Sequence, residues 1–213
     1  MKFNTLTIVG LAASMFFVSC SKGTEGETAT TDSLAVDSTA LSYNVDTTSS
    51  IINWAGNTAA LSKLGMAYGH TGTLNINSGS LEVAAGKIAG GSFEINMKSL
   101  TPTDSGYTKE NTKEKLVGHL VTADFFAVDS FPTAKFVITG VEEGKVIGDL
   151  TIKGKTNSET IEFSDLVVTD SEVKVTGKLV IDRQKYGVAW KHYLKDTVLS
   201  DELPLTITLV AKK

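Results

Sequence analysis

The feature that most constrains this chain is an alternation of apolar and polar residues that begins near Tyr43 and continues to the C-terminus. A period of two residues is typical of half-buried strands with one face in water. Short turn signals, such as Asn77-Ser78-Gly79, Glu142-Glu143-Gly144 and Thr169-Asp170-Ser171, separate the alternating segments. Many short strands in close succession predict an all-β, antiparallel sandwich or barrel of about eight strands. Segments with this period include 51–54, 73–77, 93–98, 135–139, 145–153, 172–181 and 205–209.

One stretch departs from this period. Charges dominate Lys109–Leu120, while Leu116, Val117 and Leu120 fall on one face of a helix. The stretch therefore predicts a short surface helix laid over an opening or an edge of the strands. Its charges are interpreted as a solvated face.

The first residues have the composition of an export signal. Lys2 precedes an apolar run, Leu6–Val18, that is too short to span a bilayer comfortably. The run ends at Val18-Ser19-Cys20, which resembles a bacterial lipobox, in which the cysteine is acylated. An ordinary secretory signal followed by a coincidental cysteine is the alternative.

The domain boundaries follow from this interpretation. We expect residues 1–19 to be a lipoprotein signal peptide and Cys20 to carry the lipid. Residues 20–42 are rich in serine, threonine and acids, and lack a periodic apolar face, so they are expected to form a flexible tether. The folded domain is expected over 43–213.

Composition and charge exclude several classes of function. The net charge is −4 and the pI about 5.4, which argues against a nucleic-acid partner. Arg183 is the only arginine, so recognition of phosphate by an arginine cluster is excluded. Cys20 is the only cysteine, so neither an internal disulfide nor a cysteine-based metal site is available. The three histidines lie far apart in the sequence, and no metal site is expected.

The motifs that could carry chemistry are weak. Gly148–Thr156 resembles a phosphate-binding loop, but its glycines are one residue too far apart and no helix follows. His70, between two glycines, is either a base, a metal ligand or a hydrogen bonder at a pocket mouth, or a polar residue that fixes a strand end. His119 is interpreted as a cap or packing residue. Arg183 either anchors a ligand's polar head or forms a charge pair or a stack on Tyr186.

Four blocks of sequence occur in a specific order. They are Gly69-His70-Thr71-Gly72 with Ser78-Gly79-Ser80-Leu81; Gly90-Gly91-Ser92-Phe93-Glu94-Ile95-Asn96-Met97; Leu116-x-x-His119-Leu120-x-x-x-Asp124-Phe125-Phe126 with Phe131-Pro132-Thr133-Ala134-x-Phe136; and Gly148-Asp149-Leu150-Thr151-Ile152-Lys153-Gly154 with Asp182-Arg183-x-x-Tyr186-Gly187. The spacing of the third block, followed by Gly148–Ile152, is hard to obtain by chance. Together the blocks resemble the YceI-like family of envelope proteins, and the resemblance runs from about Tyr43 to Lys213.

The resemblance implies a lipocalin-like antiparallel barrel whose elongated apolar pocket holds a polyisoprenoid or another long-chain amphiphile. It implies no catalytic residues and no metal. Three departures stand out: Ser49-Ser50 replaces a His-Ser pair, Thr156-Asn157-Ser158-Glu159 lacks a proline, and residues 57–66 are longer than expected. That longer segment is interpreted either as a flap at the barrel mouth or as a loop that caps the core.

We therefore expect an envelope protein, anchored to a bacterial membrane through acylated Cys20, that binds a polyisoprenoid, quinone-like or fatty-acyl lipid and uses no cofactor. His70 and Arg183 are the candidate polar contacts. Inward glycines such as Gly140, Gly148 and Gly177 could leave a lumen or merely permit strand bends. The candidate pocket residues are Trp54, Phe93, Ile95, Met97, Phe136, Ile138, Leu150, Ile152, Phe163, Val175, Leu179 and Tyr186.

Two other functions compete with lipid binding. A solid barrel, with Trp54, Phe93, Phe136 and Phe163 packed against each other, would indicate a structural or interaction lipoprotein. An enzyme centred on His70 is the third hypothesis. An exposed edge strand would also permit a homodimer.

Overall fold

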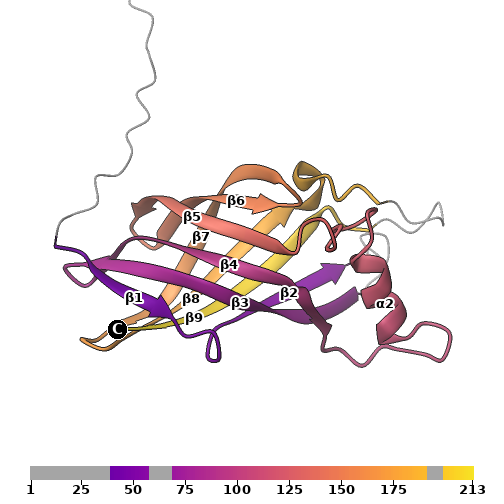
Figure 1. The fold of residues 1–213 in the computed structure, drawn as a ribbon, viewed down its shortest axis with the longest axis horizontal. Helices are drawn as coiled ribbons and strands as arrows, with labels where there is room; N and C mark the ends of the chain where they lie inside the picture. Colours follow the sequence, from indigo (N-terminus) through magenta and orange to yellow (C-terminus); the bar gives the residue numbers. More distant parts are fainter. Residues whose placement is uncertain (1–38, 58–68, 191–198) are drawn as a thin grey trace, which may run out of the picture. The chain divides into compact units, whose positions relative to one another are not determined.

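The computed structural model describes residues 39–57, 69–190 and 199–213. The signal peptide, Cys20 and nearly all of the tether and of the 57–66 segment lie outside these residues, so those predictions are not tested. Within the described residues, nine strands form one antiparallel sheet, accompanied by a short α-helix and a 3-10 turn (Figure 1). The elements are β1 (Leu41–Val45), β2 (Ile51–Asn57), β3 (Gly69–Ala84), β4 (Lys87–Pro102), α2 (Lys113–Leu120), β5 (Thr133–Glu142), β6 (Lys145–Ile152), β7 (Lys155–Val168), β8 (Glu172–Asp182), η1 (Arg183–Tyr186) and β9 (Glu202–Lys212).

The sheet closes on itself. From β2 the hydrogen-bonded order runs through β9, β8, β7, β6, β5 and β4, and β4 then pairs with β3, which pairs with β2. The short strand β1 shares a position with β2, because both lie between β3 and β9. The described residues therefore form a barrel with eight strand positions, which confirms the predicted antiparallel barrel. Closure pairs the edges on which the homodimer prediction rested, and the dimer itself stays a prediction.

A polar bend separates β1 from β2. Asp46 accepts hydrogen bonds from the backbone N–H of Thr48 at 3.0 Å and from the hydroxyls of Thr48 and Ser49, and it pairs with Lys212. The Lys212 ammonium, helped by these donors, holds the pKa of Asp46 well below its usual range. Ser50 is buried, and its Oγ exchanges two hydrogen bonds with the backbone of Val210. The serine pair that departs from the family pattern thus fastens this bend to β9.

Two of the hairpins turn at pairs of residues with positive φ. Ala85 and Gly86 (φ 49° and 75°) turn β3 into β4, and Lys153 and Gly154 (φ 50° and 72°) turn β6 into β7. Positive φ at both central residues is the pattern of the type I′ turn that suits a two-residue hairpin. The interpretation of Lys153-Gly154 as part of a strand pattern, rather than a phosphate loop, is consistent with this geometry.

The turn predicted at Asn77–Gly79 is wrong, because these residues lie inside the continuous strand β3. The pairing of β3 with β4 shifts register between Ile76 and Ser78, which marks a bulge. Gly79 lies opposite Phe93, and a Cβ atom at this position would lie only 2.8 Å from the Phe93 Cβ. The glycine therefore permits a close approach of two strands, and not a reversal of the chain.

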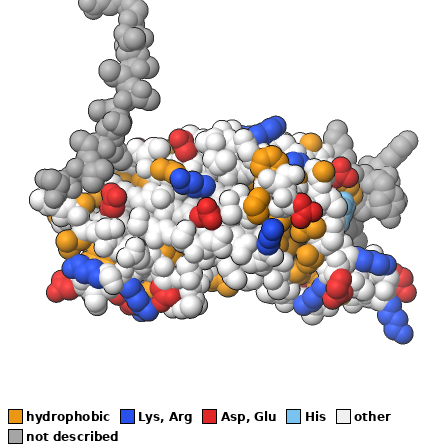
Figure 2. Space-filling view, viewed as in Figure 1, with side chains coloured by type: hydrophobic (Ala, Val, Ile, Leu, Met, Phe, Trp, Pro, Cys, Tyr) orange, Lys and Arg blue, Asp and Glu red, His pale blue; other side chains and the backbone are white. Residues whose placement is uncertain are grey.

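The predicted surface helix is present but shorter than expected. It begins after Thr112, whose side chain accepts a hydrogen bond from the Lys115 N–H at 3.3 Å and so caps the first turn. Figure 1 shows α2 at one end of the barrel. No helix in 39–57, 69–190 or 199–213 is long and apolar enough to cross a bilayer. On the face shown in Figure 2, acidic and basic side chains are interspersed over the barrel wall.

Candidate functional site

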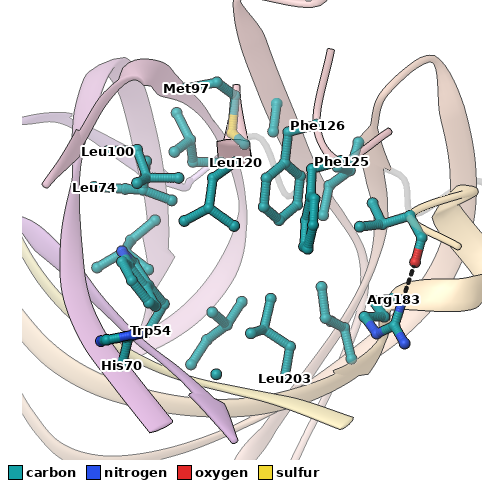
Figure 3. A pocket seen from close by; sticks show the side chains of 18 of the residues that line it. Trp54, His70, Leu74, Met97, Leu100, Leu120, Phe125, Phe126, Arg183 and Leu203 are labelled. Atoms are coloured by element: carbon teal, nitrogen blue, oxygen red, sulfur yellow. Dashed lines mark hydrogen bonds between the residues drawn. The ribbon is translucent and has the colours of Figure 1, made fainter. Parts of the chain in front are cut away.

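A cavity of about 500 Å³ lies inside the barrel and extends to α2. Figure 3 shows its side chains converging from all sides, with Trp54 and His70 on one wall and Phe125 and Phe126 on another. The lining is predominantly aliphatic and aromatic. It includes Ile52, Trp54, Leu74, Phe93, Ile95, Met97, Leu100, Leu116, Leu120, Phe125, Phe126, Phe136, Leu150, Ile152, Ile161, Leu179, Ile181, Val188, Trp190, Leu203, Leu205 and Ile207.

The structure separates the candidate pocket residues into three groups. Trp54, Phe93, Ile95, Met97, Phe136, Leu150, Ile152 and Leu179 line the main cavity. Ile138, Phe163 and Val175 point inward too, but they line a second cavity of about 30 Å³ further along the barrel. Tyr186 lines neither cavity. The alternation identifies the inward face of a strand correctly but does not tell how far along the barrel a residue lies.

Tyr186 lies outside the cavity because its hydroxyl is held elsewhere. The residue belongs to the 3-10 turn η1 and is fully buried, and its OH donates to Glu159 Oε1 at 2.8 Å. Burial first, and then the neighbouring Glu159 carboxylate, raise the pKa of the Tyr186 phenol well above its usual range. Tyr186 is therefore a neutral structural donor that joins η1 to β7.

A layer of four side chains separates the two cavities, and we call it the belt: Phe93, Phe136, Ile161 and Ile207. Phe93, Ile161 and Ile207 border both cavities, and the rings of Phe93 and Phe136 stack with centroids 5.4 Å apart. The barrel is thus not solid: the packed aromatic core of the structural-lipoprotein hypothesis is limited to this layer.

Two of the inward glycines make room for the belt. A Cβ atom on Gly148 would lie 2.4 Å from Cζ of Phe136, and one on Gly177 would lie 2.7 Å from Cγ2 of Ile161. Both distances are far below van der Waals contact, so any larger residue would push the belt side chains. The sequence left open whether the inward glycines leave a lumen or permit strand bends. Gly148 and Gly177 instead make room for side chains of neighbouring strands.

Polar groups gather at the end of the cavity near α2. His70 lines the cavity and its Nδ1 lies 3.0 Å from Oδ2 of Asp104, while the imidazole stacks on Tyr107 at 5.0 Å. Burial opposes ionisation of Asp104, but hydrogen bonds from His70, the Tyr107 hydroxyl and the N–H groups of Thr71 and Gly106 outweigh it and lower its pKa to about 2. Because this carboxylate is ionised, it holds the imidazole proton on Nδ1.

Arg183 is buried and lines the cavity, but its donors point into the protein. Its Nε donates to the Ser200 carbonyl at 3.0 Å, and its two terminal nitrogens donate to the carbonyls of Val188, Trp190 and Leu199. Nη2 also pairs with Oδ1 of Asp201 at 2.8 Å. These contacts match the five N–H groups of a guanidinium, so Arg183 joins residues 188–190 to 199–201 rather than offering donors to a ligand.

The alternation could not reveal the residues that close the α2 end. Leu116 and Leu120 come from the helix, and Phe125 and Phe126 from the loop behind it. His119 lies edge-on to Phe125 and to Trp190, with centroids 4.8 Å apart in both cases, which agrees with its interpretation as a packing residue. Two signals in the sequence pointed to this group: the predicted helix face with Leu116 and Leu120, laid over an opening, and the block from Leu116 to Phe126.

Within the described residues, no three histidine, cysteine, aspartate or glutamate side chains lie together in a way that could hold a metal ion. The site is therefore defined by shape and polarity. An antiparallel barrel with an apolar cavity and polar groups at one end has the architecture of barrels with room for one small ligand.

The chain belongs to the YceI-like domain family, whose model matches residues 43–211. A UPF0312 protein of Staphylococcus aureus strain USA300 is 44% identical over 92 residues, which are 40% of this chain and 54% of that protein. The match thus spans about half the length of the curated relatives.

Solved structures share the fold. BcnA of Burkholderia cenocepacia superposes with a TM-score of 0.59 at 21% identity, covering 79% of this chain and 99% of BcnA. A polyisoprenoid binding domain of Saccharophagus degradans gives a TM-score of 0.51 at 13% identity, covering 80% of this chain and 97% of that domain. At these identities the likeness supports the architecture alone.

Proposed function

We propose that this protein binds one long-chain amphiphile, with the hydrocarbon chain inside the barrel and the polar head near α2. The observation that carries the proposal is the 500 Å³ cavity, which is apolar from the belt to the helix and polar at one end. Its volume falls within the range of pockets that bury a small ligand. The Saccharophagus domain is described as polyisoprenoid binding, which favours an isoprenoid over other chains, with quinone-like and fatty-acyl lipids as related candidates.

The energetics suit a ligand held by its chain. Each buried methylene contributes about 0.8 kcal/mol, so a long chain supplies a large gross binding energy, part of which ordering and association remove. No strong ion pair with the head is required. This agrees with Arg183, whose donors are used by backbone carbonyls and Asp201.

We further propose that the protein works at the bacterial cell envelope, either in the periplasm or at the surface, as a lipid carrier or reservoir. The support is the sequence alone: an export signal, a lipobox ending in Cys20, and a polar tether up to residue 42. Acylation of Cys20 would keep the barrel close to a membrane from which it could take its ligand. Binding, and not catalysis, is the proposed activity of the site.

The test is native mass spectrometry of residues 20–213 carrying Cys20→Ala, secreted with a cleavable signal so that no acyl anchor or detergent interferes. We expect an adduct of one amphiphile per chain, identified after solvent extraction, or uptake from mixed bacterial lipids. Ala134 lines the cavity and Val167 is exposed on the barrel wall. Ala134→Phe should reduce the adduct, whereas the control Val167→Phe should keep it. No uptake by any folded form, or equal uptake by Ala134→Phe, would overturn the proposal.

A further inference from the structure

The belt has the geometry of a stop for the ligand's chain. Its side chains come from β4, β5, β7 and β9, so they converge from around the barrel wall. On one side lies the 500 Å³ cavity, and on the other the cavity of 30 Å³. One layer of side chains therefore divides a single apolar interior into two unequal parts.

Three glycines on neighbouring strands let the belt side chains pack directly against the backbone. Phe136 lies over Gly148, Ile161 lies against Gly177, and the Cβ of Phe93 lies close to Gly79. Each glycine stands where even a methyl group would overlap the belt residue. These residues lie on β3, β6 and β8, strands other than those of the belt. The belt is thus packed against bare backbone on three sides and has little freedom to move aside.

The space beyond the belt is also apolar. It is lined by Phe93, Ile161 and Ile207 of the belt and otherwise by apolar residues such as Ile88, Val146 and Leu209. A small cavity without polar partners does not hold water stably. The far cavity is therefore a continuation of the hydrocarbon-like interior, which a chain end could fill if the belt were opened.

We propose that the belt sets the maximum length of hydrocarbon chain that the barrel accepts, with Phe93 as the main specificity-determining residue. This inference rests on the proposed function, because it assigns the tail end of the same ligand. A chain that enters from the α2 end reaches Leu203 first and Ile207 last on β9, a distance of about 13 Å along the strand. Once its end meets the belt, further methylenes remain outside the cavity.

A length stop has a specific signature in binding. Below the limit, each added methylene should tighten binding by roughly fourfold, because it leaves water for the cavity. Beyond the limit, each added methylene should leave the affinity nearly unchanged, since the added carbons stay near the mouth of the cavity. A plot of log affinity against chain length should therefore break at one length.

The experiment uses residues 20–213 with Cys20→Ala and two ligand series: saturated fatty acids lengthened two carbons at a time, and isoprenoid alcohols lengthened one isoprene unit at a time. Binding can be followed by tryptophan fluorescence, because Trp54 and Trp190 both line the cavity, and by calorimetry. Phe93→Ala joins the two cavities, so its break should move to a longer chain. Ile161→Ala opens the belt from β7 instead of β4, and it is the second belt variant, used if Phe93→Ala does not fold. Ile88→Ala is the matched control, because Ile88 is buried and lines only the far cavity.

The outcomes separate the two proposals. If no fatty acid and no isoprenoid alcohol of any length binds the wild-type barrel, the proposed function fails, and the length stop with it. If chains bind but the break stays at the same length in both belt variants, the length stop alone is overturned. An equal move of the break in Ile88→Ala would also overturn it, because general loosening of the barrel would then explain the shift. A move confined to the belt variants supports it.

Discussion

Replacing Arg183 by lysine tests whether the barrel rim depends on the fork of guanidinium donors or on charge. The side chain is buried and donates to the carbonyls of Val188, Trp190, Leu199 and Ser200 while pairing with Asp201. Lysine keeps the positive charge but has a single nitrogen on a flexible stem, so it cannot reach carbonyls on both sides at once.

The magnitude follows from the groups left without a donor. At least two of the carbonyls lose their partner in Arg183→Lys, and an unsatisfied buried polar group costs about 1–3 kcal/mol. Because Trp190, Leu199 and Ser200 are only partly buried, we expect a loss of about 2–4 kcal/mol in the free energy of unfolding. The Asp201 side chain is 57% exposed, so the ion pair itself should contribute little. Asp201→Asn should therefore cost under about 1 kcal/mol.

The assay is urea unfolding of both variants and the wild type, with the slope m compared to ensure that the same transition is measured. A loss in Asp201→Asn equal to that in Arg183→Lys would refute the reasoning, because charge pairing would then dominate. Unchanged stability of Arg183→Lys with weakened lipid binding would refute it differently, since Arg183 would then act as a head-group anchor.

Two further predictions concern single groups near the site. The lowered pKa of Asp104 means that its contribution to stability is present above about pH 4 and is lost as the pH falls toward about 2, because the unfolded chain takes up the proton first. Asp104→Asn should flatten the acid limb of unfolding in this window, and an unchanged limb would contradict the assignment. Tyr186→Phe removes the donor to Glu159 and should cost about 1–2 kcal/mol in urea unfolding without changing lipid affinity; a change in affinity would place Tyr186 at the ligand after all.

The alternation in the sequence predicted most of the barrel because strand facing is encoded locally. Phe93, Ile95 and Met97 are buried on one face of β4, as their spacing requires. The depth of a residue along the barrel is not local, since it depends on the register between strands. For that reason Ile138 and Phe163 were predicted to line the same pocket as Trp54 and Met97, although they border only the far cavity.

The structural roles of the glycines were the hardest feature to predict from the sequence. Gly79 was predicted in a turn and Gly148 in a lumen or a bend, because both conformations are common for glycine. In the structure each accepts an aromatic residue of another strand, Phe93 and Phe136 respectively. Such close approaches are set by the pairing of distant segments, and no local pattern reports them.

The different polarity of the two ends of the cavity predicts the direction in which the proposed amphiphile binds. At the belt a polar head would meet only hydrocarbon side chains such as Phe136 and Ile161, and burial without a hydrogen-bond partner costs about 2–7 kcal/mol. At the α2 end, His70 and the Asp104 carboxylate that orients it lie beside the helix and its Thr112 cap. The same hydrocarbon chain gains as much in either direction, so the head decides the orientation. The proposed amphiphile should therefore bind tail first. A fluorescent label on its head group should report contact with residues near α2 and not with the side chains of the belt.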